Sequence, residues 1–243
     1  MTSDEPDEKP ADEETTRFIA RALGSGDVIG HFRVVRLLGE GGSGAIYEAH
    51  NIHNEDERVA LKILQPDIPD RERFFELMRA EANAMQRLKN EAVVQYRTFG
   101  RIPESDEFYL VIEYVEGPTL GKAMRARPLD EAALRRLALR LLEGLGAAHE
   151  QGVIHRDLSP DNVVLPGGDP DRATLIDFGI ARNGAFDPLG GIGFAGKLSY
   201  AAPEQLAGGA IGPWTDLYTL GLVLAAAARG EKLPMGKDIA GAI

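Results

Sequence analysis

Apolar positions follow two different patterns along the chain. Before residue 116 they fall in short blocks rich in valine, isoleucine and leucine, bounded by glycine, proline and charged residues, which is typical of strands. Between the third and fourth blocks, an apolar stripe at helical spacing predicts a helix over Arg71–Leu88. The expected strands are His31–Leu38, Ala45–Asn51, Arg58–Leu64, Val93–Ile102 and Phe108–Val115.

Helical spacing dominates the rest of the chain. Asp130 is placed to cap a long helix, in which apolar residues recur at 134, 137, 138, 141, 142, 145 and 148. A second apolar stretch, Leu217–Ala228, is too short to cross a bilayer and predicts a buried helix. We therefore expect an α+β fold with two lobes and a cleft between them. One lobe has five strands and one helix, and the other is mainly helical.

Charge and composition narrow the classes of function. The net charge of −11 argues against a general nucleic-acid binder, and the absence of cysteine excludes disulfides and thiolate metal sites. The first fourteen residues hold seven acids and one lysine, so we expect a disordered acidic tail and linker over residues 1–29. No signal sequence or membrane segment is evident within the chain. We expect a cytoplasmic protein, with membrane anchoring beyond residue 243 left open.

A glycine pattern marks the turn between the first two expected strands. Gly39, Gly41 and Gly44 fit Gly-x-Gly-x-x-Gly, followed by Ile46. A dinucleotide-binding turn would need a helix directly afterwards, whereas here a strand is expected. In a hairpin of this kind the backbone N–H groups can approach phosphates, because no side chains obstruct them. Glycines also mark ordinary turns, which is the alternative.

A lysine and a glutamate are expected to meet behind this hairpin. Lys62 lies on the same strand face as the small residue Ala60. Lys62 can therefore bind phosphates, while Ala60 leaves room beside it for a flat base. An ordinary edge lysine is the alternative. Glu81 lies on the apolar stripe of the predicted helix with Met78 and Met85. A buried carboxylate is costly without a partner, and Lys62 is the natural one.

Three more motifs follow in order and carry the strongest signal. They are the catalytic loop His155–Asn162, which opens with His-Arg-Asp, then Asp177-Phe178-Gly179 and Ala202-Pro203-Glu204. Together with the glycine loop and the lysine, this set closely resembles the protein kinase family. The Ser-Pro-Asp-Asn and Ala-Pro-Glu-Gln stretches are similar to those of bacterial relatives of eukaryotic serine/threonine kinases. The resemblance extends from about residue 30 to residue 230.

The resemblance implies a domain organisation and a reaction. It implies a kinase N-lobe over residues 30–115 and a C-lobe over residues 116–243, which we expect to be incomplete. The expected activity is transfer of the ATP γ-phosphate to serine or threonine hydroxyls of a protein substrate, with Mg²⁺, or Mn²⁺ in its place, as the metal. A pseudokinase that binds nucleotide without transfer is the alternative, and a small-molecule kinase of related fold is a third. The oligomeric state is not readable from the sequence.

The resemblance also assigns residue roles. Asp157 would accept the substrate proton, Asn162 and Asp177 would bind the metal, and Lys62, fixed by Glu81, would hold the phosphates. The residues that would cover the phosphates are Gly39, Glu40, Gly41, Gly42, Ser43 and Gly44. The residues that would surround adenine are Ile46, Ala60, Ile112, Glu113, Val115 and Val164. Asp216 resembles the residue that anchors the catalytic loop.

The chain departs from the family pattern at positions that affect the chemistry. Ser159 stands where the family has a lysine that neutralises the transferring phosphate, and Lys197 stands where it has a threonine. We infer that Lys197 supplies the missing charge, with a solvent-facing loop residue as the alternative. Glu204 is expected to lack the arginine that commonly pairs with it. The segment 180–198 contains no serine, threonine or tyrosine, so we do not expect activation by its phosphorylation.

Overall fold

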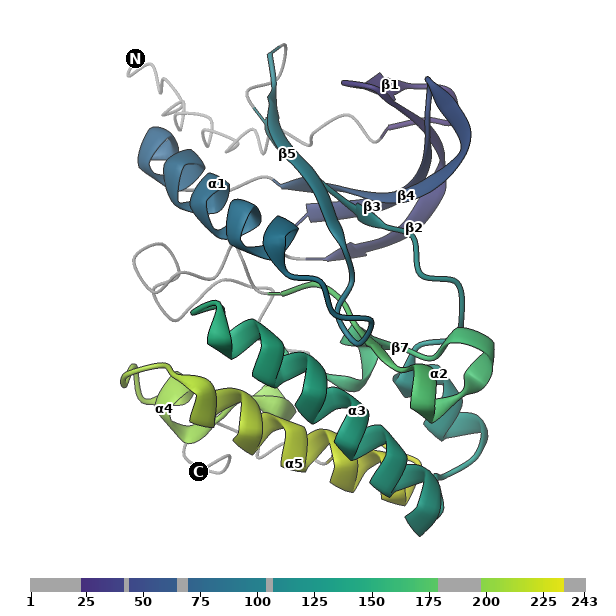
Figure 1. The fold of residues 1–243 in the computed structure, drawn as a ribbon, viewed down its shortest axis with the longest axis vertical. Helices are drawn as coiled ribbons and strands as arrows, with labels where there is room; N and C mark the ends of the chain where they lie inside the picture. Colours follow the sequence, from purple (N-terminus) through teal and green to yellow (C-terminus); the bar gives the residue numbers. More distant parts are fainter. Residues whose placement is uncertain (1–22, 42–43, 65–69, 104–106, 179–197, 234–243) are drawn as a thin grey trace, which may run out of the picture.

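The computed structural model describes residues 23–41, 44–64, 70–103, 107–178 and 198–233. A six-stranded antiparallel sheet, with the order β1-β2-β3-β4-β6-β5, forms one half of the molecule. With one helix, α1, we call it the sheet half (Figure 1). Its strands are β1 Val28–Ile29, β2 Phe32–Gly41, β3 Gly44–Asn51, β4 Asn54–Leu64, β5 Tyr96–Ile102 and β6 Glu107–Glu113.

Alternation along β4 decides which side chains face the core of the sheet. Val59, Leu61 and Ile63 are buried in one apolar cluster with residues of β2, β3 and β6. Ala60 and Lys62 point to the other face, as the sequence predicts. The strand therefore supports the sheet with one face and supplies functional side chains with the other.

Helix α1, Arg71–Arg87, packs against β5. The Asp70 side chain accepts a hydrogen bond from the Arg73 N–H at 3.0 Å and caps the first turn. Phe74, Met78 and Met85 are buried on the side of the helix that faces the sheet. The predicted helix is confirmed, one residue shorter than expected at its C-terminal end.

The helical half contains four helices among the described residues. Figure 1 shows α3 and α5 lying side by side along its length. Asp130 caps α3 as expected, accepting from the Ala133 N–H at 2.8 Å. The helices are α2 Leu120–Ala126, α3 Glu131–Glu150, α4 Pro203–Leu206 and α5 Pro213–Arg229. A two-stranded hairpin, β7 Val163–Val164 and β8 Thr174–Leu175, completes this half, with 3₁₀ turns at Pro160–Asn162, Pro166–Gly168, Pro170–Arg172 and Leu198–Tyr200.

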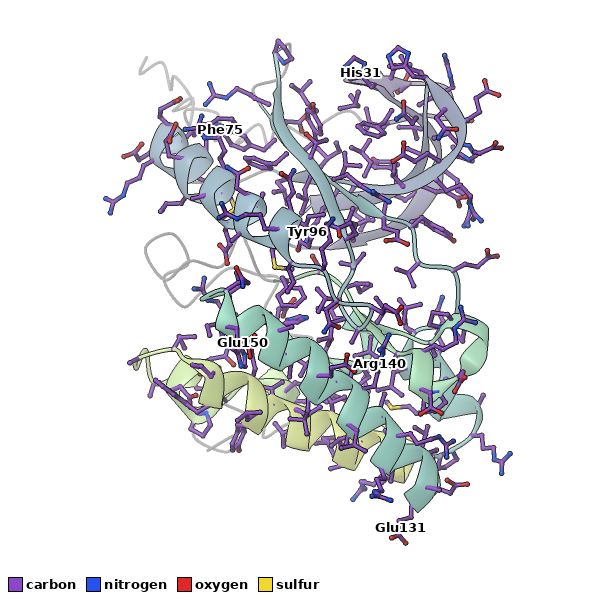
Figure 2. The ribbon with its side chains drawn as sticks, viewed as in Figure 1. His31, Phe75, Tyr96, Glu131, Arg140 and Glu150 are labelled. Atoms are coloured by element: carbon purple, nitrogen blue, oxygen red, sulfur yellow. The ribbon has the colours of Figure 1, made fainter. Side chains whose placement is uncertain are left out.

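A continuous apolar cluster joins the two halves. It contains Met78 and Met85 from α1, Leu158 from the catalytic loop, and Phe178. Tyr96, at the start of β5, lies where the sheet meets the helical half (Figure 2). Among the described helices, none is long and apolar enough to cross a membrane.

Candidate active site

The glycine-rich turn is a β-hairpin, as the sequence predicts. Gly41 at the end of β2 pairs with Gly44 at the start of β3, and Gly39 pairs with Ile46. Gly44 has φ of +123°, and a Cβ atom there would lie 1.8 Å from the Ile63 carbonyl oxygen. Only glycine fits this position, because β4 approaches the turn so closely. Gly42 and Ser43 lie outside the described residues.

One face of the sheet gathers four of the predicted site residues. Directly opposed residues of antiparallel strands point to the same side, and Ile46 is opposite Lys62 while Ala60 is opposite Ile112. Since Ala60 and Lys62 also share a face, these four side chains line one surface. Val164, buried in β7, belongs to the helical half.

The connection that leaves β6 contains the other two predicted adenine contacts. Glu113 is the last residue of β6, and its N–H donates to the Gln95 carbonyl at 2.9 Å. That N–H therefore cannot also serve a ligand. The next residue, Tyr114, donates its N–H to the Arg58 carbonyl at 3.4 Å. Val115 packs its side chain against the main apolar cluster.

Lys62 and Asp177 form an ion pair across the two halves. The lysine ammonium contacts the Asp177 carboxylate, and the two side chains are only 12% and 18% exposed. Asp177 has φ of +55°, which is uncommon for a residue other than glycine. The fold thus brings together opposite charges that are 115 positions apart in sequence.

Glu81 lies inward as expected, but the expected pair with Lys62 is not formed. Its side chain is 13% exposed and lies 3.9 Å from the guanidinium of Arg156. Burial raises the pKa of Glu81 to about 7, and the positive charge of Arg156 opposes this rise only in part. The expected pair is not formed because Asp177 contacts the lysine ammonium in this structure, while α1 directs Glu81 toward Arg156.

A buried tyrosine lies beside both carboxylates. Tyr96 is 2% exposed. Burial raises the pKa of its phenol well above the ordinary value, and the nearby negative charges of Asp177 and Glu81 raise it further. The phenol therefore stays neutral, and Tyr96 adds no third negative charge to this region.

The catalytic loop holds Asp157 and Asn162 against each other. The Asn162 side-chain amide donates to the Asp157 backbone carbonyl at 2.7 Å and to its carboxylate at 3.2 Å. The Ile176 N–H donates to the Asn162 carbonyl at 3.0 Å, which places Asn162 next to the segment that carries Asp177. Asn162 directly precedes β7 and Asp177 follows β8 by two residues, so an amide and a carboxylate lie at neighbouring ends of this hairpin, with a second carboxylate, Asp157, beside Asn162.

Asp216 anchors this loop from α5, which confirms the role expected for it. Its carboxylate accepts the backbone N–H groups of His155 at 2.8 Å and Arg156 at 2.9 Å. His149, near the end of α3, contacts the same carboxylate through Nε2 at 2.7 Å. Asp216 is 1% exposed, so these donors compensate for the loss of water around its charge.

His155 forms an apolar contact with the Asp-Phe-Gly segment. Its ring centroid lies 4.4 Å from that of Phe178. Burial lowers the pKa of His155, so the ring is neutral. Its Nε2 atom lies 3.1 Å from the Ile176 carbonyl, so this nitrogen carries the proton and donates it.

Two contacts near α4 were not foreseen from the sequence. Thr215 donates its hydroxyl to the Glu204 carboxylate at 2.6 Å, so Glu204 has a partner although the family's arginine was expected to be missing. Gln205 donates its side-chain amide to the Arg156 carbonyl at 2.8 Å. The amide directly after Ala-Pro-Glu was the only sequence signal, since Gln205 and Arg156 are 49 positions apart.

The predicted metal pair fits a magnesium ion with few protein ligands. Among the described residues, no group of three or more histidine or acidic side chains could hold a metal by itself. Asp177 and Asn162 instead offer one carboxylate and one amide oxygen, and Mg²⁺ is often held by one or two protein groups plus phosphates and water. In this structure Lys62 contacts one oxygen of the Asp177 carboxylate, so a metal bound there would compete with the lysine ammonium for this group.

The sequence predicts that Lys197 supplies the charge that Ser159 lacks, and the structure describes position 159 of this pair. Ser159 is 3% exposed, and its hydroxyl has no hydrogen-bond partner among the described residues. Lys197 lies outside the described residues, as does the rest of 179–197.

Comparison with known proteins identifies relatives over most of the chain. A family model described as "Protein kinase domain" matches residues 32–240. The chain is 34% identical to the serine/threonine-protein kinase pkn2 of Myxococcus xanthus, covering 80% of this chain and 24% of that protein. It is 35% identical to the probable serine/threonine-protein kinase PkwA of Thermomonospora curvata, covering 87% and 28%.

Solved structures agree with this result. The crystal structure of the Mycobacterium tuberculosis PknI kinase domain superposes with a TM-score of 0.71 at 27% identity. The match covers 90% of this chain and 79% of that domain. The chain spans about a quarter of the length of the curated relatives described above.

Proposed function

Because the chain belongs to the protein kinase family, we propose that it transfers the γ-phosphate of ATP to serine or threonine hydroxyls of proteins. The observation that carries the proposal is the convergence of Lys62, Asp177, Asn162 and Asp157, which come from β4, the segment after β8, and the catalytic loop. The named relatives are serine/threonine-protein kinases, which supports the choice of acceptor. The alignment covers only about a quarter of each relative, so the proposal names a class of acceptor and no particular substrate protein.

ATP would bind between the sheet face and the helical half. Adenine would lie against Ile46, Ala60 and Ile112, with Val164 on the other side. The shared orientation of the first three residues and the burial of Val164 support this placement. Adenine would use backbone groups of Glu113 and Val115, and for Glu113 this means the carbonyl because its N–H is already bonded. The glycine hairpin would cover the phosphates.

Nucleotide binding would change the partners of the charged residues. Lys62 would leave Asp177 for the α- and β-phosphates, and Glu81 would leave Arg156 to fix Lys62. The raised pKa of Glu81 supports this exchange, because a carboxylate that is poorly compensated gains from a closer cation. Magnesium, or manganese in its place, would be held by Asn162 and Asp177 and would neutralise phosphate charge.

Asp157 would orient the substrate hydroxyl and accept its proton. The hydrogen bond from Asn162 to the Asp157 carboxylate supports this role, because it fixes the direction of that carboxylate. Lys197 would supply the positive charge that Ser159 cannot. Ser159 offers only an uncharged, buried hydroxyl at this position, and that hydroxyl has no hydrogen-bond partner among the described residues, which supports the need for a charge from elsewhere.

The test is transfer of radiolabelled phosphate from ATP to a generic basic protein, followed by identification of the labelled amino acids. We expect phosphoserine and phosphothreonine, and no label without a divalent metal. ATP binding with no transfer under Mg²⁺ or Mn²⁺ would contradict the proposal and indicate a nucleotide-binding interaction module.

A further inference from the structure

The side chain of Gln205 links two backbone segments that are distant in sequence. Its Oε1 accepts the Ala202 N–H at 3.0 Å, and its Nε2 donates to the Arg156 carbonyl at 2.8 Å. A backbone N–H can only donate, so the amide oxygen must face Ala202 and the amide nitrogen must face Arg156. The amide oxygen therefore caps the N-terminus of α4, and the amide nitrogen binds the catalytic loop.

The Arg156 carbonyl belongs to the peptide group that leads into Asp157. Arg156 has φ of +63°, a conformation that non-glycine residues adopt only when their surroundings hold them in it. Asp216 binds the N–H of this residue at 2.9 Å, and Gln205 binds its carbonyl at 2.8 Å. The Asp157 N–H donates to the His155 carbonyl at 2.8 Å. Both peptide groups of Arg156 are thus fixed, which sets the direction in which the chain enters Asp157.

We propose that Gln205 is a positioning residue for Asp157, acting through its hydrogen bond to the Arg156 carbonyl. The inference rests on the proposed function, in which Asp157 orients the substrate hydroxyl. A carboxylate displaced by a fraction of an ångström no longer faces that hydroxyl correctly, although the ATP site is unaffected. The link also couples α4 to the catalytic loop without any phosphate.

Two substitutions separate this role from simple capping of α4. Gln205→Glu keeps the acceptor for the Ala202 N–H but places an oxygen against the Arg156 carbonyl, which repels it. Gln205→Lys keeps a donor for that carbonyl but loses the acceptor for Ala202. Gln205→Met removes both hydrogen bonds at similar length. Gln151, which is exposed at the end of α3, gives the matched control Gln151→Glu.

The experiment compares kcat and the KM for ATP in the full chain. Gln205→Glu and Gln205→Met should lower kcat by roughly 10- to 100-fold, with the KM for ATP changed by less than about 3-fold. Gln205→Lys and Gln151→Glu should stay within about 3-fold of the wild type in kcat. The opposite order, with Gln205→Glu active and Gln205→Lys impaired, would assign Gln205 to the cap alone and overturn the proposal. Equal activity in all four variants would overturn it as well.

Hydrogen exchange tests the link from Gln205 to Arg156 without depending on turnover, so it can be judged separately from the proposed function. If the wild type transferred no phosphate, the proposed function would fail, and hydrogen exchange would still report on the link. Amides of the catalytic loop should exchange faster in Gln205→Glu than in Gln205→Lys. Equal exchange in the two variants would show that the amide does not hold this loop.

Discussion

Arg156 is held by residues from three different elements. Asp216 of α5 binds its N–H, Gln205 of α4 binds its carbonyl, and Glu81 of α1 lies 3.9 Å from its guanidinium. In many kinases the corresponding arginine pairs with a phosphate on the activation segment. Here a carboxylate of the chain lies in reach instead, and the backbone contacts hold the residue in its uncommon conformation.

A prediction at the scale of single residues concerns Lys197 and Ser159. Lys197→Thr should lower kcat by roughly 10-fold or more while leaving ATP affinity nearly unchanged, because the charge is needed mainly during transfer. Adding Ser159→Lys to the same variant should restore part of the rate, since position 159 lies two residues after Asp157 in the catalytic loop, where the family has its lysine. Steady-state kinetics measure both effects. An unchanged rate in Lys197→Thr would return this residue to the solvent-facing interpretation.

Helix α1 controls the charge balance of the site through Glu81. The helix buries Met78, Ala82 and Met85 against the rest of the protein, and this packing carries Glu81 inward with them. Burial raises its pKa from 4.5 to about 7, so at neutral pH the group is near its titration midpoint. A movement of α1 that exchanged Arg156 for Lys62 would favour the ionised form.

The pH dependence of stability should reveal this group. The unfolded chain releases the Glu81 proton near 4.5 and the folded chain near 7, so the folded state binds more protons in between. The contribution of Glu81 to stability therefore falls as pH rises through this window, by about 3 kcal/mol at most. Glu81→Gln removes the effect, so the variant should gain stability relative to the wild type between about pH 5 and pH 8.

Urea unfolding at about pH 5 and pH 8 measures the free energy of unfolding of Glu81→Gln relative to the wild type. Glu76→Gln is the matched control, because Glu76 lies on the same helix and is 54% exposed. The control should change little with pH. A stability difference for Glu81→Gln that is the same at both pH values would contradict a raised pKa in the folded state. The same variant should lose phosphoryl transfer if Glu81 fixes Lys62 during the reaction.

Local patterns predicted most elements, and the exceptions have separate physical causes. The expected strand Val93–Ile102 begins only at Tyr96, because Val93 and Val94 pair with Leu175 of the helical half. Helix α5 begins at Pro213, before the apolar run, because proline suits a first turn and the Thr215 hydroxyl accepts the Gly212 N–H. Helix α2 and the short strand β1 have too little periodicity to be recognised from the sequence.

The site was predictable to a similar degree. Residue identities and spacing pointed to Lys62, Asp157 and Asp177, and alternation along β4 gave the correct face for Lys62. The ion-pair partner of Lys62 could not be predicted from the sequence. Both Asp177 and Glu81 are candidates, and the position of Glu81 depends on how α1 packs. Contacts such as that from Gln205 to Arg156 depend on the whole fold.

At the scale of the whole molecule, the sequence argues against control by phosphorylation of the segment 180–198. The segment 180–198 contains no hydroxyl-bearing residue, and Tyr200, which follows it, is 4% exposed. Phosphate added within this segment therefore cannot be the switch. We expect control to come from a partner or from the acidic tail.

Phosphatase treatment tests this directly. Activity should be unchanged, within about 2-fold, before and after treatment. Mass spectrometry should find no phosphate between residues 180 and 198. A large loss of activity traced to Ser199 or Tyr200 would overturn this account of control.

The central claim is that this site transfers phosphate with Asp157 facing the acceptor, and one substitution tests it most directly. Asp157→Asn removes the proton acceptor but leaves Lys62, Asn162 and Asp177 in place. The account predicts that kcat falls by roughly 10²- to 10⁴-fold while the thermal stabilisation by ATP and Mg²⁺ is retained. Wild-type turnover in Asp157→Asn, with the protein shown to be folded, would contradict it.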